Sequence, residues 1–152
     1  MEVTGAHALS PYHRSPDAWP RRDYLELRAL ETAPGSARAH VVNVLREWRL
    51  AVLAEAAELI ASELVTNSVL ATRAVGWPVR QPPVRLWLFS DRASVLVHVW
   101  DAIAAAPVPG EAGADDESGR GLAIVGALSQ AWDYYPDAGF GGKVTWALIA
   151  AP

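Results

Sequence analysis

The chain has 152 residues, of which 51% are hydrophobic, so it is long enough to build one sizeable core without disulfides or metals. It contains no cysteine, which excludes a disulfide framework, thiolate metal sites and cysteine nucleophiles and agrees with a reducing compartment. A formal net charge of −4 disfavours sequence-independent binding of nucleic acid, and no stretch has the pattern of a membrane span or an export signal. We therefore expect a soluble, cytoplasmic protein whose partners are proteins or small molecules.

The N-terminal residues predict a leader followed by a strand. Residues 1–20 mix proline with polar residues and show no periodicity, which is typical of a flexible leader. We expect the folded domain over 21–152. Loose alternation of apolar and polar residues over 22–31 predicts its opening strand.

Two amphipathic helices are predicted next. Apolar residues at helical spacing predict a helix over 37–49 and a longer one over 51–74, which Gly76 and Pro78 end. The polar face of the longer helix is expected to carry Glu55, Glu58, Ser62 and Thr66.

The second half of the chain is rich in predicted strands. Branched and aromatic residues predict a hairpin first and two further strands after it. These strands are expected over 84–89, 94–100, 131–135 and 143–150. A long loop over 102–118 and a short apolar helix over 121–129 separate the two pairs, and a loop of that length is usually functional or disordered.

This order of elements predicts the fold class. Helices that follow one another, rather than alternating with strands, favour an α+β protein over a doubly wound one. We expect a two-layer α/β sandwich whose sheet is mixed but mostly antiparallel, with the helices packed on one face.

Two polar residues interrupt the apolar stripe of the longer predicted helix. Ile60, Leu64 and Ala71 define the stripe, and Glu63 and Asn67 lie on it at i, i+4 spacing. Leaving such a group buried without a partner costs about 1–3 kcal/mol. They therefore need a ligand, a metal ion, water or a local partner, and a locally satisfied buried pair is the structural alternative.

Asp101 ends the second strand of the predicted hairpin. Alternation places it in phase with Val95, Val97 and Val99, so its carboxylate should face the helices. An Asp at a strand end also commonly caps a turn, which is the alternative interpretation.

A glycine-containing segment ends the long loop and opens the short helix. It reads Glu117-Ser118-Gly119-Arg120-Gly121-Leu122. Free N–H groups and the helix dipole at such a position favour an anion, although the segment is neither a Walker loop nor a complete dinucleotide fingerprint.

Taken together, these motifs resemble those of GHKL ATP-binding domains over residues 22–150. They are, in order, Glu63-Leu64-Val65-Thr66-Asn67, Asp101, Gly119-Arg120-Gly121-Leu122 and Gly142-Lys143. Within that superfamily the chain is most similar to the histidine-kinase-like ATPase domains of bacterial anti-sigma-factor serine/threonine kinases. The resemblance implies a Bergerat-type ATP-binding fold.

The same resemblance implies roles for the polar residues of the helix and strand. Asn67 would help to ligate the Mg²⁺ that bridges the phosphates of ATP, and Glu63 would polarise water or the attacking serine hydroxyl. Asp101 would accept a hydrogen bond from the adenine amino group, and the loop 102–118 would be the ATP lid. A hard cation and phosphoryl transfer suit these oxygen ligands.

The glycine motifs would complete the nucleotide site by resemblance. Gly119 and Gly121 would let backbone amides approach phosphate, with Arg120 and Leu122 in the same contact segment. Lys143 resembles the late glycine-lysine pair that lies close to the nucleotide. A solvated or edge-protecting charge is the alternative interpretation for a strand lysine.

The implied activity is ATP-dependent phosphorylation of a small antagonist protein, which controls exchange of a sigma factor between partners. Pairing of two copies through their sheets is also implied by the resemblance. No phosphoacceptor-histidine context precedes the domain, so a detached histidine-kinase module is a third and weaker hypothesis. His7, His13, His40 and His98 are expected to have ordinary surface or core roles.

Two positions depart from the pattern and favour a second hypothesis. The histidine that often follows the N-box asparagine is Ala71 here, and the Asp-x-Gly or Asp-x-Ser motif is Asp101-Ala102-Ile103. Ile103 is branched and cannot readily adopt the backbone geometry open to glycine. The alternative is a catalytically weak or inactive GHKL-like protein that acts by binding a protein partner.

Overall fold

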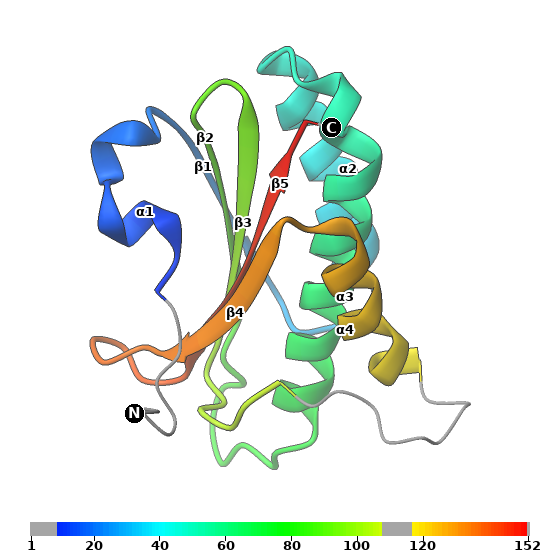
Figure 1. Cartoon of the computed structure of the whole chain (residues 1–152). Helices are drawn as coiled ribbons and strands as arrows, with labels where there is room; N and C mark the ends of the chain where they lie inside the picture. The colour runs from blue at the N-terminus through cyan, green and yellow to red at the C-terminus, as the bar shows by residue number, and fades with distance from the viewer. Residues whose placement is uncertain (1–8, 108–116, 152) are drawn as a thin grey trace.

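One sheet organises the part of the chain that the structure describes, residues 9–107 and 117–151 of a computed structural model. It is an α+β fold in which helices pack against a five-strand antiparallel sheet (Figure 1). In chain order the elements are α1 Pro11–Arg14, β1 Arg21–Leu27, α2 Ala33–Glu47, α3 Ala54–Arg73, β2 Val84–Ser90, β3 Ser94–Asp101, α4 Glu117–Leu128, β4 Ala131–Pro136 and β5 Lys143–Ala150.

The sheet has the strand order β1-β2-β3-β5-β4, and each neighbouring pair is antiparallel. β2 and β3 form the predicted hairpin, in which Ser90 lies opposite Val95. The central strand β3 pairs along its length with β5, so that Asp101 lies opposite Lys143. This pairing brings two candidate site residues together at one end of the sheet.

The helices α2, α3 and α4 lie on one side of the sheet, and α1 lies on the other (Figure 1). The core between the sheet and the three helices includes Leu45 of α2, Ile60 of α3, and Leu86 and Val97 of the hairpin, all fully buried. Burying one such side chain contributes about 1.5–3 kcal/mol. No described helix combines the length and the apolar character needed to cross a membrane.

The predicted elements are present, with differences at their ends. β1 stops at Leu27, four residues before the predicted end of the strand, and α2 begins at Ala33 rather than at residue 37. Pro34 lies in the first turn of α2, where its missing N–H leaves no helical hydrogen bond unmade. A 3₁₀ turn, Ala51–Leu53, delays the start of α3 to Ala54.

The prediction that Ser62 lies on the polar face of the long helix is wrong. Ser62 is buried, and its Oγ accepts a hydrogen bond from Nη1 of Arg38 on α2 at 3.1 Å. Because α2 packs along α3, the buried surface of α3 is wider than a single apolar stripe suggests.

The face of the sheet away from α2, α3 and α4 is also apolar. Phe89, Trp100 and Trp146 belong to a second cluster of buried residues on this outer face. Residues 10–19, which the sequence places in a flexible leader, lie against it: the ring of Tyr12 stacks on Phe89 at 4.2 Å, and Trp19 is buried. The aromatic rings account for this packing, because each removes a large apolar area from water.

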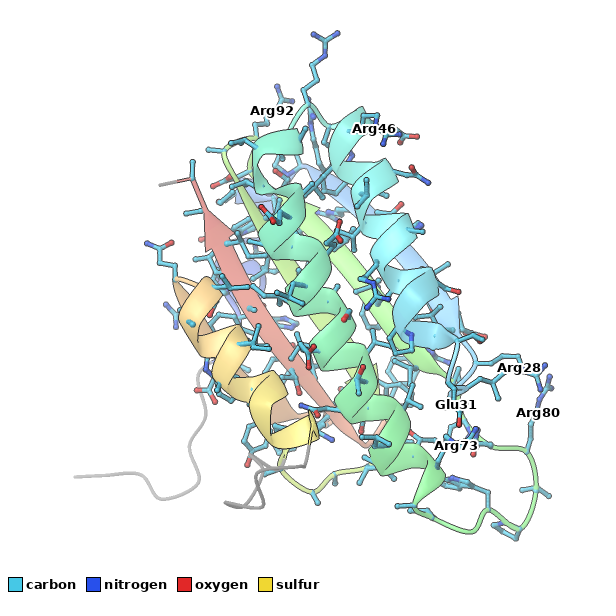
Figure 2. The ribbon with its side chains drawn as sticks, turned by 90° about the vertical axis from the view of Figure 1, so that its right-hand side faces the viewer. Arg28, Glu31, Arg46, Arg73, Arg80 and Arg92 are labelled. Atoms are coloured by element: carbon cyan, nitrogen blue, oxygen red, sulfur yellow. The ribbon has the colours of Figure 1, made fainter. Side chains whose placement is uncertain are left out.

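Charged side chains gather at the two ends of the helical layer. Figure 2 shows Arg28, Glu31, Arg73 and Arg80 at the end where α3 finishes, and Arg46 and Arg92 at the opposite end. Nη1 of Arg73 donates a hydrogen bond to the carbonyl oxygen of Ala29 at 3.4 Å. This contact ties the end of α3 to the segment between β1 and α2.

Candidate functional site

A pocket of about 380 Å³ lies between the second half of α3, the neighbouring ends of β3 and β5, and the residues that follow β3. We call it the α3 pocket. Its lining includes Asn67, Ala71, Asp101, Ile103 and Lys143. Small-molecule sites commonly have volumes of about 300–1,000 Å³. Three of the residues singled out in the sequence therefore share one pocket of suitable size.

Asp101 is fully buried at the floor of this pocket, facing the helices as its phase on the strand predicts. The Nζ of Lys143 lies 2.9 Å from Oδ1 and 3.1 Å from Oδ2, and Ser68 donates its hydroxyl hydrogen to Oδ2 at 2.5 Å. The backbone N–H of Ile103 donates to Oδ1 at 3.0 Å. A carboxylate has about four lone-pair positions, so these intramolecular donors occupy all of them.

Lys143 is equally well satisfied. Its side chain is 4% exposed, and besides the two carboxylate contacts its Nζ donates to the carbonyl oxygen of Ile103 at 3.0 Å. An ammonium group has three N–H donors, and each has an acceptor here. The pair is therefore a closed, buried ion pair that joins the ends of β3 and β5 to the start of the following loop.

Gly142 allows β3 and β5 to pair in the register that places Lys143 opposite Asp101. It has a φ of +70°, and a Cβ at this position would collide with the carbonyl oxygen of Asp101. Only glycine combines that backbone conformation with so close an approach. The glycine-lysine motif of the sequence thus has a structural purpose in positioning Lys143 against Asp101.

Asn67 is the least satisfied polar group of the pocket. It is half-buried and lines the pocket, and its Nδ2 is buried without a hydrogen-bond partner among the described residues. A half-turn of the carboxamide exchanges its nitrogen and oxygen. Asn67 can therefore offer a ligand either an N–H donor or an oxygen.

Glu63 lies one helical turn before Asn67 but is not among the described residues that line the α3 pocket. Its side chain lies against α4 instead: a Cβ built on Gly121 would be 2.5 Å from Oε1 of Glu63. A larger residue at position 121 would therefore have to displace the carboxylate of Glu63. This contact places Glu63 and the glycine motif side by side.

The remaining motif residues lie in α4. Leu122 is 4% exposed and belongs to the core between the helices and the sheet. Gly119 and Arg120 lie near the start of α4, which begins at Glu117 rather than at the predicted residue 121, and the side chain of Arg120 is outside the described part of the structure. The predicted lid spans residues 102–118, and its residues 108–116 also lie outside the described part of the structure.

Ser68 is a site residue that the sequence arguments missed. Its hydroxyl is buried and bonds Asp101 directly, and Thr145 of β5 lines the same pocket. The signal for Ser68 was its place immediately after Asn67, on the side of α3 that meets β3. Ala71 and Ile103, the two residues that differ from the GHKL motifs, also line the pocket, so both shape the space available to a ligand.

The described side chains do not form a metal site of their own. Within residues 9–107 and 117–151, no group of three or more His, Asp or Glu side chains is placed to hold a metal ion. A magnesium ion at Asn67 would depend on oxygens of its ligand, as it does where nucleotides carry the metal. No protein-family model matches the sequence of this chain, and no curated protein sequence matches it.

Proposed function

We propose that this protein is an ATP-binding regulatory protein of the GHKL superfamily, with the two-layer α/β sandwich of the Bergerat-type fold. The observation that carries the proposal is the α3 pocket, in which Asn67, Asp101 and Lys143 come together from three different elements. These residues were singled out in the sequence as parts of one nucleotide site. Their convergence on a cavity of about 380 Å³ supports that assignment.

The residues of the pocket fit Mg-ATP at the phosphate side. The carboxamide of Asn67, whose Nδ2 has no hydrogen-bond partner among the described residues, can turn its oxygen toward a hard cation. In this proposal Glu63 orients the attacking hydroxyl, and the free backbone N–H groups in the first turn of α4, which contains Gly119, face phosphate. ATP supplies the phosphoryl group, and positioning and charge neutralisation are the protein's contribution.

At the adenine side the fit requires a local exchange of partners. Asp101 can accept a hydrogen bond from the adenine amino group only when one intramolecular donor leaves it. Ser68 is the donor whose removal costs least, since its hydroxyl is neutral and can rotate, whereas Lys143 neutralises the buried charge. Nucleotide binding would therefore be coupled to rotation of the Ser68 hydroxyl.

The regulatory part of the proposal follows the anti-sigma-factor serine/threonine kinases. The protein would bind a sigma factor and phosphorylate a small antagonist protein, so that the phosphorylation state of the antagonist sets which partner is held. Two copies would pair as a homodimer.

Isothermal titration calorimetry with ATP, in the presence and absence of Mg²⁺, tests nucleotide binding. We expect Mg²⁺-dependent binding to the wild type that weakens at least about tenfold in Asn67→Ala and in Asp101→Asn, because each loses a direct ligand contact. The matched control is Asn43→Ala, which changes an exposed asparagine on α2 and should leave the affinity unaltered.

Lack of binding at millimolar ATP would contradict the proposal, as would equal affinity in the wild type and Asn67→Ala. Circular dichroism of each variant separates loss of binding from loss of fold. A positive result justifies a phosphotransfer assay with a candidate antagonist, in which Glu63→Gln should retain ATP binding and lose transfer.

One observation favours the second candidate function, a GHKL-like protein that regulates by binding a partner without catalysis. The carboxylate of Asp101 is already saturated by donors of the protein itself. If the α3 pocket takes no nucleotide, the closed ion pair is a structural support for the surface formed by α3 and the loop after β3. Binding of a sigma factor without any response to ATP would distinguish this function from the first.

A further inference from the structure

A second and larger cavity lies on the outer face of the sheet, opposite α2, α3 and α4. Its volume is about 580 Å³, and we call it the outer-face pocket. It shares no described lining residue with the α3 pocket, from which the sheet separates it, so it does not depend on nucleotide binding there. Its walls include Trp87 and Phe89 of β2, Trp100 of β3, Tyr12 of α1 and Phe140 of the turn between β4 and β5.

The pleat of the sheet gathers these rings. Trp87 pairs with His98, and His98 pairs in turn with Trp146 of β5, so the three side chains form a row across the outer face. Tyr12 stacks on Phe89 with ring centroids 4.2 Å apart. Flat rings on adjacent strands make walls that suit a planar molecule, since stacked aromatic pairs are favourable by about 0.5–1.5 kcal/mol beyond their burial.

His98 is a buried polar group in this pocket. It is 4% exposed and lines the cavity, yet its Nε2 has no hydrogen-bond partner among the described residues. Its described neighbours are rings: Tyr12, His13 and Phe89. A buried nitrogen left unpaired costs about 1–3 kcal/mol, which a ligand with a matching group recovers. Burial lowers the pKa of His98 to about 3, so at neutral pH the ring offers one donor and one acceptor.

Most charged groups at the rim already interact with other protein groups, and the exception is the buried Nε of Arg85, which makes no hydrogen bond among the described residues. The guanidinium of Arg85 lies 5.0 Å from the ring centroid of Trp100 and 3.6 Å from Glu26, and Nε of Arg22 donates to the carbonyl oxygen of Trp19. Asp137 accepts the N–H of Gly139. Recognition by stacking is therefore favoured over recognition of an ion.

We propose that the outer-face pocket binds a small, uncharged, planar aromatic molecule that carries a hydrogen-bonding group for His98. A phenol or a nitrogen heterocycle of two fused rings has this chemistry. The aromatic walls supply affinity, and His98 supplies selectivity for ligands that bear the polar group over plain hydrocarbons.

Titration of the ¹⁵N-labelled full chain with 2-naphthol and with naphthalene, followed by ¹H–¹⁵N correlation spectra, tests the proposal. We expect 2-naphthol to shift amide signals of β2, β3 and the turn at Phe140. In His98→Phe, 2-naphthol should bind about tenfold more weakly, while naphthalene changes little, because only the hydrogen bond is lost. The control Asn43→Ala, at an exposed position of α2 away from this pocket, should bind both probes as the wild type does.

A second variant keeps the test valid if His98→Phe does not fold. Phe140 is 78% exposed at the rim, so Phe140→Ala should preserve the fold and weaken both probes. Shifts confined to α3 and residues 103–107, or equal weakening of both probes by His98→Phe, would overturn the proposal. So would self-association in sedimentation that 2-naphthol reverses, which would assign this face to a second copy of the chain.

Discussion

At the scale of single residues, the chemistry of the α3 pocket is dominated by one buried ion pair. Asp101 and Lys143 are nearly inaccessible to solvent, and their remaining hydrogen-bonding capacity is used by Ser68 and Ile103. A buried pair contributes little net stability against an apolar replacement, but removal of one partner leaves an uncompensated charge. Asp101 and Lys143 should therefore be strongly interdependent.

We expect Lys143→Met to lower the free energy of unfolding by about 3–5 kcal/mol, because Asp101 is then buried without its cation. The double variant Lys143→Met/Asp101→Asn should recover a large part of that loss. Urea denaturation measures both, and Arg46→Met, which removes an exposed cation on α2, is the matched control. Additive effects of the two substitutions would contradict the proposed coupling.

At the scale of elements, the turn between β4 and β5 decides whether this pair can form. Two successive glycines, Gly141 and Gly142, have positive φ values of 80° and 70°. Only Gly142 also lies against the backbone of Asp101, since a Cβ on Gly141 would meet nothing within 4 Å. Substitutions at the two positions therefore distinguish backbone strain, which affects both, from steric collision, which affects only Gly142.

Gly141→Ala should destabilise the protein by about 1–2 kcal/mol through its left-handed backbone alone. Gly142→Ala should lose about 1–3 kcal/mol more, because the methyl group forces β3 and β5 apart. Gly76→Ala, which has open space and no positive φ, should change the stability by no more than about 0.5 kcal/mol. Thermal unfolding of the three variants measures the order, and equal losses at Gly141 and Gly142 would contradict the collision.

The elements also show what the sequence can predict. Periodicity and turn residues predict the helices, the hairpin and the last two strands, because these signals are local. Their ends are less well predicted, as the start of α2 at Ala33 shows. Alternation correctly turns Asp101 toward the helices, but its saturation is not predictable, because Ser68 and Lys143 lie 33 and 42 residues away in sequence. The packing of Tyr12 on Phe89 is likewise a long-range contact without a local signal.

At the scale of the whole molecule, one sheet supports an apolar cluster on each face. The inner cluster joins the sheet to the helices and borders the α3 pocket. The outer cluster surrounds His98, whose pKa is lowered first by burial and then by the nearby His13 of α1. Unfolding exposes His98 to water, so the stability of the whole chain is linked to its protonation.

The pKa of His98 is about 3 in the folded protein, against 6.5 for a histidine in water, so acid favours the unfolded chain. The contribution of His98 is present above pH 6.5 and is lost as the pH falls toward 3. Between pH 7 and pH 5 the loss should be about 2 kcal/mol. Urea denaturation of the wild type and of His98→Phe across this range measures it, and parallel pH profiles would contradict this assignment.

The division of rings between the two faces has a spectroscopic consequence. Trp87 and Trp100 line the outer-face pocket, whereas no tryptophan is among the described residues of the α3 pocket. A ligand in the outer-face pocket therefore lies against two tryptophans, whereas a ligand in the α3 pocket touches none of the described ones directly. Trp100 and Asp101 are nevertheless consecutive on β3 and point to opposite faces, so a change in emission on addition of a nucleotide would signal a distortion transmitted through the strand.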